Sequence, residues 1–103
     1  MITTLVQIKM PAPMRLEKAR EVFTGTAPRY REVPGLIRKY YLLSEDGGTV
    51  GGVYLWESRD AAKAMYNQAW YAFIREKYGV APDVAYFESP VVVDNLAAEI
   101  ISA

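Results

Sequence analysis

The pattern of apolar and polar residues changes period several times along the chain, and its densest apolar stretch spans residues 35–58. This stretch reads G-L-I-R-K-Y-Y-L-L-S-E-D-G-G-T-V-G-G-V-Y-L-W-E-S. Two runs rich in aromatic and β-branched residues flank residues 46–48, and an Asp-Gly or Gly-Gly pair suits the positive φ angles of a tight turn. The pattern therefore predicts a β-hairpin whose two-residue loop is Asp46-Gly47 or Gly47-Gly48.

Both faces of this hairpin are largely apolar. The same side chains share a face with either loop, because in both cases the numbers of two paired residues add up to an odd value. One face holds Ile37, Lys39, Tyr41, Leu43, Val50, Gly52, Tyr54 and Trp56, and the other holds Leu36, Arg38, Tyr40, Leu42, Gly51, Val53, Leu55 and Glu57. A half-exposed antiparallel hairpin alternates cleanly between apolar and polar residues. We therefore expect both faces to be covered, although the pattern leaves open which one meets the helices.

Upstream of the hairpin, the pattern predicts one strand and one helix. Residues 2–10 alternate, with Val6 and Ile8 on one side and Leu5 and Gln7 on the other, which is typical of a strand. Helical spacing begins at residue 15 and is carried by Leu16, Ala19, Phe23, Ala27 and Tyr30. Pro28 interrupts this stripe, so we expect a kink or a restart, with Thr26 as a candidate cap.

Downstream of the hairpin, Ser58 is a candidate N-cap for a second helix. Helical spacing restarts near Asn67 and ends at Gly79, which suits the last turn. Residues 83–93 predict a final strand, in which Pro90 marks an edge or a bulge. Asp94 is a candidate cap for a short C-terminal helix.

The expected element order is β-α-β-β-α-β with a terminal helix, in a single domain of residues 1–103. This order predicts an α+β, ferredoxin-like fold in which both helices cover one face of a four-stranded antiparallel sheet. The other face is then bare, yet the hairpin side chains assigned to it are apolar and aromatic. A second copy of the chain, sheet against sheet in a symmetric dimer, is the simplest cover.

The composition narrows the classes of function. Twelve basic and twelve acidic residues give a net charge of zero, whereas a nucleic-acid-binding protein normally has a basic face. The chain has no cysteine and no histidine, so it lacks thiolates, the commonest metal ligand, the usual axial haem ligand and the default base near neutral pH. We expect no metal and no nucleic-acid partner, and any catalysis must rely on carboxylates, phenols, amides, lysine or the substrate.

The chain also shows no sign of membrane insertion. No apolar run approaches eighteen residues, and the N-terminus has no charged region followed by an apolar core. We therefore expect a cytoplasmic protein with no membrane partner.

The sequence resembles the dimeric α+β barrel superfamily, and more narrowly the small bacterial YdhR-type monooxygenases, which are related to the antibiotic-biosynthesis monooxygenases. The resemblance spans nearly the whole chain. The matching segments are L-V-Q-I at residues 5–8, P-G-L-I-R-K at 34–39, G-G-V-Y-L-W at 51–56 and F-E-S-P-V-V-V-D-N at 87–95.

This resemblance implies a homodimer with a small-molecule pocket between the sheet and the helices of each subunit. Related enzymes oxidise phenolic, polycyclic substrates to quinones with oxygen and no cofactor, because the deprotonated substrate supplies the electrons. Such a site needs amide or hydroxyl donors and aromatic walls. By resemblance, the catalytic residues would be Asn67, Trp70 and Gln7, and the substrate-binding residues would be Tyr54, Trp56, Tyr66, Tyr71 and Arg38. Haem-degrading members bind iron through a histidine, which this chain lacks.

Each candidate also has an ordinary structural explanation. Gln7 would need a hydrogen-bonding partner if buried, Asn67 could cap a helix restart, and a tryptophan is most often a core residue. Arg38 could pair with Glu57 across the hairpin. Glu88 is the best carboxylate candidate for a base if it is buried, and an ordinary surface residue if it is not.

Two hypotheses for the function follow. The first is a cofactor-independent monooxygenase that acts with oxygen on a small aromatic or polycyclic substrate. The alternative is a non-catalytic dimeric protein that binds a small molecule or acts in stress response. An isomerase or cyclase would need an acid and base pair that the sequence does not provide. The sequence identifies neither the substrate nor any assembly beyond a dimer.

Overall fold

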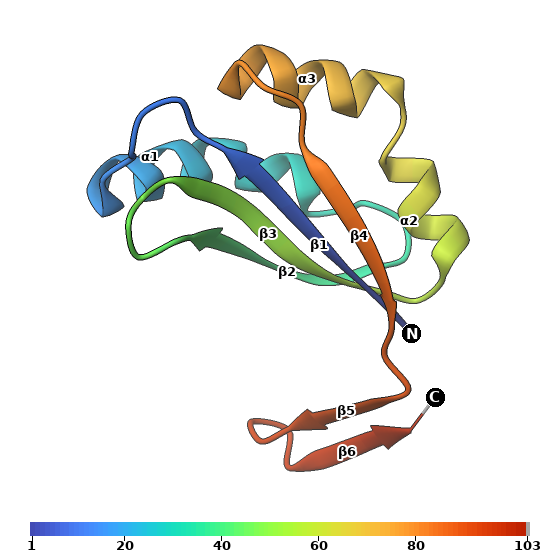
Figure 1. The fold of residues 1–103 in the computed structure, drawn as a ribbon. Coiled ribbons are helices and arrows are strands. Elements are labelled where there is room, and N and C mark those ends of the chain that lie inside the picture. The colour runs from blue at the N-terminus through green and yellow to red at the C-terminus, as the bar shows by residue number, and fades with distance from the viewer. Residues whose placement is uncertain (103) are drawn as a thin grey trace.

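The computed structural model describes residues 1–102 and contains a four-stranded antiparallel sheet with its helices on one face (Figure 1). The strand order is β2-β3-β1-β4, which with the order of elements gives the expected ferredoxin-like α+β fold. The elements are β1 (Ile2–Lys9), α1 (Leu16–Thr26), the 3-10 helix η1 (Ala27–Tyr30), β2 (Leu36–Leu43), β3 (Thr49–Trp56), α2 (Arg59–Met65), α3 (Gln68–Tyr78), β4 (Asp83–Glu88), β5 (Val91–Asp94) and β6 (Glu99–Ser102).

The alternation of β1 decides which face of the sheet meets the helices. Its buried residues are Ile2, Thr4, Val6 and Ile8. The buried side chains of β3, Val50, Tyr54 and Trp56, lie on the same face as these because strand partners share a face. The face that the sequence assigned to Tyr41, Tyr54 and Trp56 is therefore the inner one.

The turn between β2 and β3 is longer than predicted. Leu43 pairs with Val50, and the Ser44 N–H donates to the Thr49 carbonyl at 2.9 Å, which leaves residues 45–48 as a four-residue loop. The two-residue turn was wrong because the Asp46 carboxylate stabilises the wider loop. It accepts hydrogen bonds of 2.8 Å from the Ser44 hydroxyl and from the N–H of Gly48.

The predicted faces of the hairpin are confirmed except at one β-bulge. The register shifts between Leu36 and Arg38, so that Leu36 pairs with Trp56 and Ile37 is the additional residue. Leu36 thus packs against the core, while Ile37 is 44% exposed. The sequence had placed these two residues the other way round, because strict alternation does not anticipate a bulge.

The predicted helix ends at Ser58 and Gly79 are confirmed by the capping geometry, whereas the side chain of Thr26 makes no capping hydrogen bond to η1. The Ser58 side chain accepts a hydrogen bond from the N–H of Ala61 at the start of α2. Gly79 adopts a left-handed conformation with φ of 82° after α3. Pro28 lies at the start of η1, so the α1 stripe continues as a 3-10 turn.

The C-terminal segment forms a hairpin instead of the predicted helix. The predicted strand 83–93 ends at Glu88, and β5 and β6 then pair as a separate two-stranded sheet. The Asp94 carboxylate accepts hydrogen bonds of 3.1 Å from the N–H groups of Leu96 and Ala97, so it caps a turn between the two strands. Figure 1 shows this hairpin on the side of the main sheet that faces away from the helices.

The outer face of the main sheet carries exposed apolar side chains. Tyr40 is 54% exposed, Leu42 37% and Phe87 52%. The C-terminal hairpin extends over one end of this face, next to Arg38, Tyr40 and Leu55. Within residues 1–102, no helix is long and apolar enough to cross a membrane.

Candidate functional site

A cavity of about 560 Å³ opens between η1 and the loop after it, α2, and the start of α3. Its volume lies within the range of small-molecule sites, roughly 300–1,000 Å³. Its walls are mostly apolar, with three polar side chains, Arg29, Glu57 and Asn67, among the lining residues. The full lining is Arg29, Tyr30, Val33, Pro34, Gly35, Glu57, Ala61, Ala64, Met65, Asn67, Ala69 and Trp70.

A glycine fixes one wall of this cavity. Gly35 has φ of 78°, and a Cβ atom there would lie 2.5 Å from the Cβ of Ala61. Its carbonyl accepts a hydrogen bond of 2.8 Å from the N–H of Glu57. The loop after η1 can therefore approach α2 this closely only because residue 35 has no side chain.

Asn67 stands where α2 ends and α3 begins. Its Oδ1 accepts a hydrogen bond of 2.9 Å from the N–H of Trp70, which makes it the N-cap of α3. Its Nδ2 donates to the carbonyl of Ala64 at 3.3 Å. Both amide atoms of Asn67 are therefore engaged in local structure, although the residue also lines the cavity.

Trp70 forms the inner wall of the cavity. Only 2% of its surface is exposed, and its indole N–H donates to the Tyr30 hydroxyl at 3.2 Å. Because Tyr30 belongs to η1, this hydrogen bond connects α3 to the 3-10 helix across the back of the cavity.

Behind this wall, the space between sheet and helices is filled by aromatic side chains. The indole N–H of Trp56 donates to the Thr4 hydroxyl at 2.9 Å, and Thr4 shares a second hydrogen bond of 2.6 Å with the Tyr66 hydroxyl. Tyr54 stacks on Trp56 with ring centroids 5.9 Å apart. Burial raises the pKa of Tyr54 and of Tyr66, so both phenols stay protonated near neutral pH.

Lys39 is a chemically distinctive residue that the sequence did not single out. Its Nζ lies 3.5 Å from the ring centroids of Tyr30 and Tyr41, and 4.8 Å from that of Tyr54. Burial lowers the pKa of Lys39 to about 7. A lysine in the middle of an otherwise apolar strand face was the available signal.

The structure brings only some of the predicted site residues together. Asn67 and Trp70 share the cavity, while Tyr54, Trp56 and Tyr66 pack in the core behind it. Tyr71 is 36% exposed on α3 and packs edge-on against Trp70, with ring centroids 5.0 Å apart.

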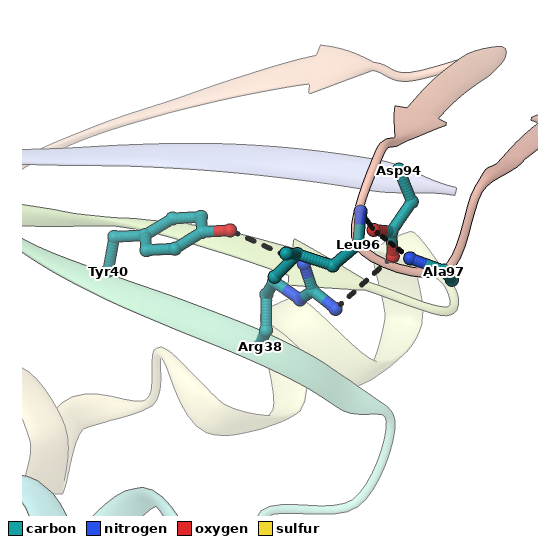
Figure 2. Close-up of polar contacts among 5 residues, drawn as sticks. All are labelled: Arg38, Tyr40, Asp94, Leu96 and Ala97. Atoms are coloured by element: carbon teal, nitrogen blue, oxygen red, sulfur yellow. Dashed lines mark hydrogen bonds and ion pairs between the residues drawn. The ribbon is translucent and has the colours of Figure 1, made fainter.

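Gln7 and Arg38 lie on the outer face of the sheet, away from this cavity. Gln7 is exposed and pairs with Gly51 and Asp83 on the neighbouring strands. Arg38 forms an ion pair of 3.7 Å with Asp94 and donates to the Tyr40 hydroxyl at 3.4 Å (Figure 2). The possible cross-strand pair with Glu57 does not form, because Arg38 pairs with Leu55 in the observed register and Glu57 lies beside Gly35.

No acidic side chain of the described residues is buried in the core. Glu88 is exposed and forms an ion pair of 2.9 Å with Arg59, so it has the ordinary surface role. Every acidic residue is exposed except Asp94, which is partly buried. Among residues 1–102, no group of three or more acidic, histidine or cysteine side chains is placed to hold a metal ion.

Comparison with known proteins places these features in context. Residues 5–85 match the family model described as putative mono-oxygenase ydhR. No match was found among curated proteins.

Several solved structures share the fold. A monooxygenase from the gene ActVA-Orf6 of Streptomyces coelicolor, solved with the ligand nanaomycin D, is 25% identical with a TM-score of 0.65, over 85% of this chain and 86% of that one. A putative antibiotic biosynthesis monooxygenase from Caulobacter crescentus is 20% identical with a TM-score of 0.64, over 85% and 88%. SnoaB, a cofactor-independent oxygenase from Streptomyces nogalater, is 16% identical with a TM-score of 0.61, over 85% and 91%.

Proposed function

Because the chain belongs to the ydhR putative mono-oxygenase family, we propose that it is a cofactor-independent monooxygenase acting on a small aromatic or polycyclic substrate. The observation that carries this proposal is the cavity of about 560 Å³ between η1, α2 and α3. Its apolar walls suit a flat ring system, and its three polar side chains can orient a hydroxyl group. The Streptomyces coelicolor monooxygenase, solved with the ligand nanaomycin D, supports a small-molecule ligand on this fold.

In the proposed reaction, the substrate supplies the electrons. A phenol loses its proton, and the phenolate transfers electrons to O₂. One oxygen atom enters the ring, which ends as a quinone, and the other leaves as water. The chain then has to bind the ring, exclude water and favour the phenolate.

The proposed roles of the individual residues follow from where they lie. Trp70 forms the wall against which the ring packs, and Asn67 positions that wall through its cap on α3. Tyr54, Trp56 and Tyr66 support the wall from behind. Gln7 and Arg38 lie on the outer face, so we assign them to the contact between subunits.

This contact is the second part of the proposal: a second copy of the chain covers the outer face. Tyr40, Leu42 and Phe87 are exposed on this face, and the β5–β6 hairpin exposes Val91 and Ile100 beside it. Apolar patches of this kind on a small protein mark interaction surfaces. A closed dimer would cover the sheet and the hairpin together.

The test is oxygen uptake with a panel of phenols and hydroquinones, in the presence of a chelator. Ala64→Phe should fill the cavity and abolish uptake, because Ala64 is an exposed residue of its lining. Ala72→Phe is the matched control on α3, since Ala72 is exposed and lies outside that lining. Uptake that never exceeds that of buffer, or that survives Ala64→Phe unchanged, would rule the proposal out.

One observation favours the alternative of a non-catalytic binding protein. Asn67 already uses its Oδ1 and one of its two Nδ2 N–H groups within the chain, so it offers only one N–H group to a developing oxyanion. Tight binding of the same phenols without oxygen uptake, lost in Ala64→Phe, would support this alternative.

A further inference from the structure

The inner face of the sheet carries a lysine, Lys39, whose amine has no acidic partner. Lys39 extends from the inner face of β2 toward η1, and it is partly buried. None of the ion pairs among residues 1–102 includes Lys39. A buried ammonium normally has a carboxylate beside it, because an unpaired charge away from water is costly.

Aromatic rings from three elements take the place of that carboxylate. The Nζ of Lys39 lies over the rings of Tyr30 from η1, Tyr41 from β2 and Tyr54 from β3, at 3.5, 3.5 and 4.8 Å from their centroids. Rings attract an ammonium ion but cannot neutralise it. The Tyr41 hydroxyl is already hydrogen-bonded to Thr26 at 2.7 Å.

The other titratable or charged groups around this amine are few. Tyr78 of α3 lines the same small cavity, and burial raises its pKa to about 12. Phe73 of α3 also lines it, and Arg29 of η1 stacks on that ring at 3.8 Å. An anion is therefore missing from the surroundings of Lys39.

The packing around Lys39 leaves space for its side chain and for one water molecule. Gly52 on β3 lacks a Cβ atom, which would lie 3.1 Å from the Cε of Lys39. Beside the lysine is a cavity of about 20 Å³, enough for one water molecule.

Tyr30 lines both this small cavity and the larger one of about 560 Å³. Its ring therefore stands between the two spaces, held by the hydrogen bond of 3.2 Å that its hydroxyl accepts from the Trp70 indole.

We propose that Lys39 is the proton acceptor for a phenolic ligand, and that its ammonium form then holds the phenolate. The proposal rests on the proposed function and adds to it the base that a chain without histidine needs. The ligand ring occupies the larger cavity, and its hydroxyl reaches Lys39 when Tyr30 swings aside.

The proton transfer is balanced within the complex. The O–H bond of the phenol breaks, an N–H bond forms on Nζ, and the electron pair stays on the phenolate oxygen. The new ammonium ion gains the anion that it lacks in the free protein, while the rings of Tyr41 and Tyr54 continue to stabilise it. A pKa near 7 lets the amine accept a proton at neutral pH.

The experiment uses 4-nitrophenol, whose anion alone absorbs at long wavelength. The full chain is titrated with it without oxygen, at a pH about one unit below the pKa of the free phenol. We expect the bound phenol to be ionised at least about threefold more than the free phenol, and this excess to disappear in Lys39→Met. Lys63→Met, which removes an exposed lysine on α2, should keep the full excess.

A second variant separates proton acceptance from simple attraction of charge. Lys39→Arg keeps a cation that cannot take up a proton. It should still favour the phenolate, but binding should now release about one proton to the buffer, as measured by calorimetry in buffers of different ionisation enthalpy. Both chains are measured with unsubstituted phenol at about pH 8, where the free ligand is still protonated and Lys39, with a pKa of about 7, is mostly neutral. The wild-type chain should then release almost none, because the proton moves to Lys39.

Equal ionisation in the wild type and in folded Lys39→Met would overturn the inference, and so would an absence of binding. The experiment contains no oxygen, so its outcome does not depend on turnover. Ionisation of the bound phenol without oxygen uptake would leave Lys39 as the base and reject the monooxygenase. Oxygen uptake together with unchanged ionisation of the bound phenol in Lys39→Met would support the monooxygenase and reject Lys39 as the base.

Discussion

At the scale of single residues, Thr4 shows how the aromatic core tolerates polar atoms. Its hydroxyl is fully buried and hydrogen-bonded to both the Trp56 indole and the Tyr66 hydroxyl. Within residues 1–102, no buried side-chain nitrogen or oxygen lacks a hydrogen-bond partner. The aromatic residues of this core are therefore held by specific hydrogen bonds as well as by packing.

We expect Thr4→Val to lower the free energy of unfolding by about 2–4 kcal/mol, because it leaves two buried groups without a partner. Thr4→Ser keeps the hydroxyl and loses one methyl group, so it should cost only about 1 kcal/mol. Urea denaturation of both variants measures the difference. Equal losses in the two would show that packing, and not the hydroxyl, is what matters at this position.

Lys39 makes a second prediction at this scale, on the pH dependence of stability. Burial lowers its pKa from an ordinary value of 10.5 to about 7, so between these values the unfolded chain binds more protons than the folded one. The free energy of unfolding should therefore rise with pH across this window, by about 1–3 kcal/mol. The slope comes from Lys39, so Lys39→Met should lack it.

The measurement is chemical denaturation from pH 6.5 to about 9.5, below the range where tyrosines titrate. Above that range the raised pKa values of Tyr54, Tyr66 and Tyr78 act in the opposite direction, because the unfolded chain loses those protons first. Parallel curves for the wild type and Lys39→Met would contradict a lowered lysine pKa.

The roles of single residues were only partly visible in the sequence. Alternation correctly placed Gln7 with Leu5 on one face of β1. It did not predict which face of the strand meets the helices. Lys39 was assigned to the correct face of β2, yet its surroundings depend on Tyr30 and Tyr54 from two other elements. Contacts between distant segments are set by the whole fold, which local patterns do not report.

At the scale of elements, the junction between α2 and α3 depends on Asn67. We expect Asn67→Ala to cost about 1 kcal/mol of stability through the lost cap, and Asn67→Asp to keep most of it. Thermal unfolding of the two variants measures this.

The same pair of variants tests the role of Asn67 in activity. If Asn67 acts only by positioning Trp70, Asn67→Asp should retain most of the oxygen uptake. Loss of uptake in a stable Asn67→Asp variant would point instead to direct contact between the amide and the substrate.

Local signals predicted most elements because they act within a few residues. Ser58 and Asn67 cap helices, and Gly79 ends one, as expected. The C-terminal helix was wrong, because an aspartate cap such as Asp94 serves a turn as well as a helix. Pairing between β5 and β6 then decided the outcome.

At the scale of the whole molecule, the bare outer face leads to a prediction on assembly. We expect the chain to sediment as a dimer, and Leu42→Lys to produce monomers, because it places a charge within the proposed contact. Leu16→Lys is the matched control, since Leu16 is 58% exposed on α1, on the opposite side of the sheet. A monomeric wild type at micromolar concentration would contradict the proposed dimer.

The placement of the two tryptophans, Trp56 and Trp70, gives the molecule an optical property. Both indoles are buried and donate hydrogen bonds inside the core, so their fluorescence should be emitted at short wavelength and shift to longer wavelength on unfolding. Trp70 lines the large cavity and Trp56 does not. A ligand in the cavity should therefore quench one indole and leave the other bright, whereas unfolding changes both. The protein carries its own reporter, which distinguishes an occupied site from a lost fold without any added label.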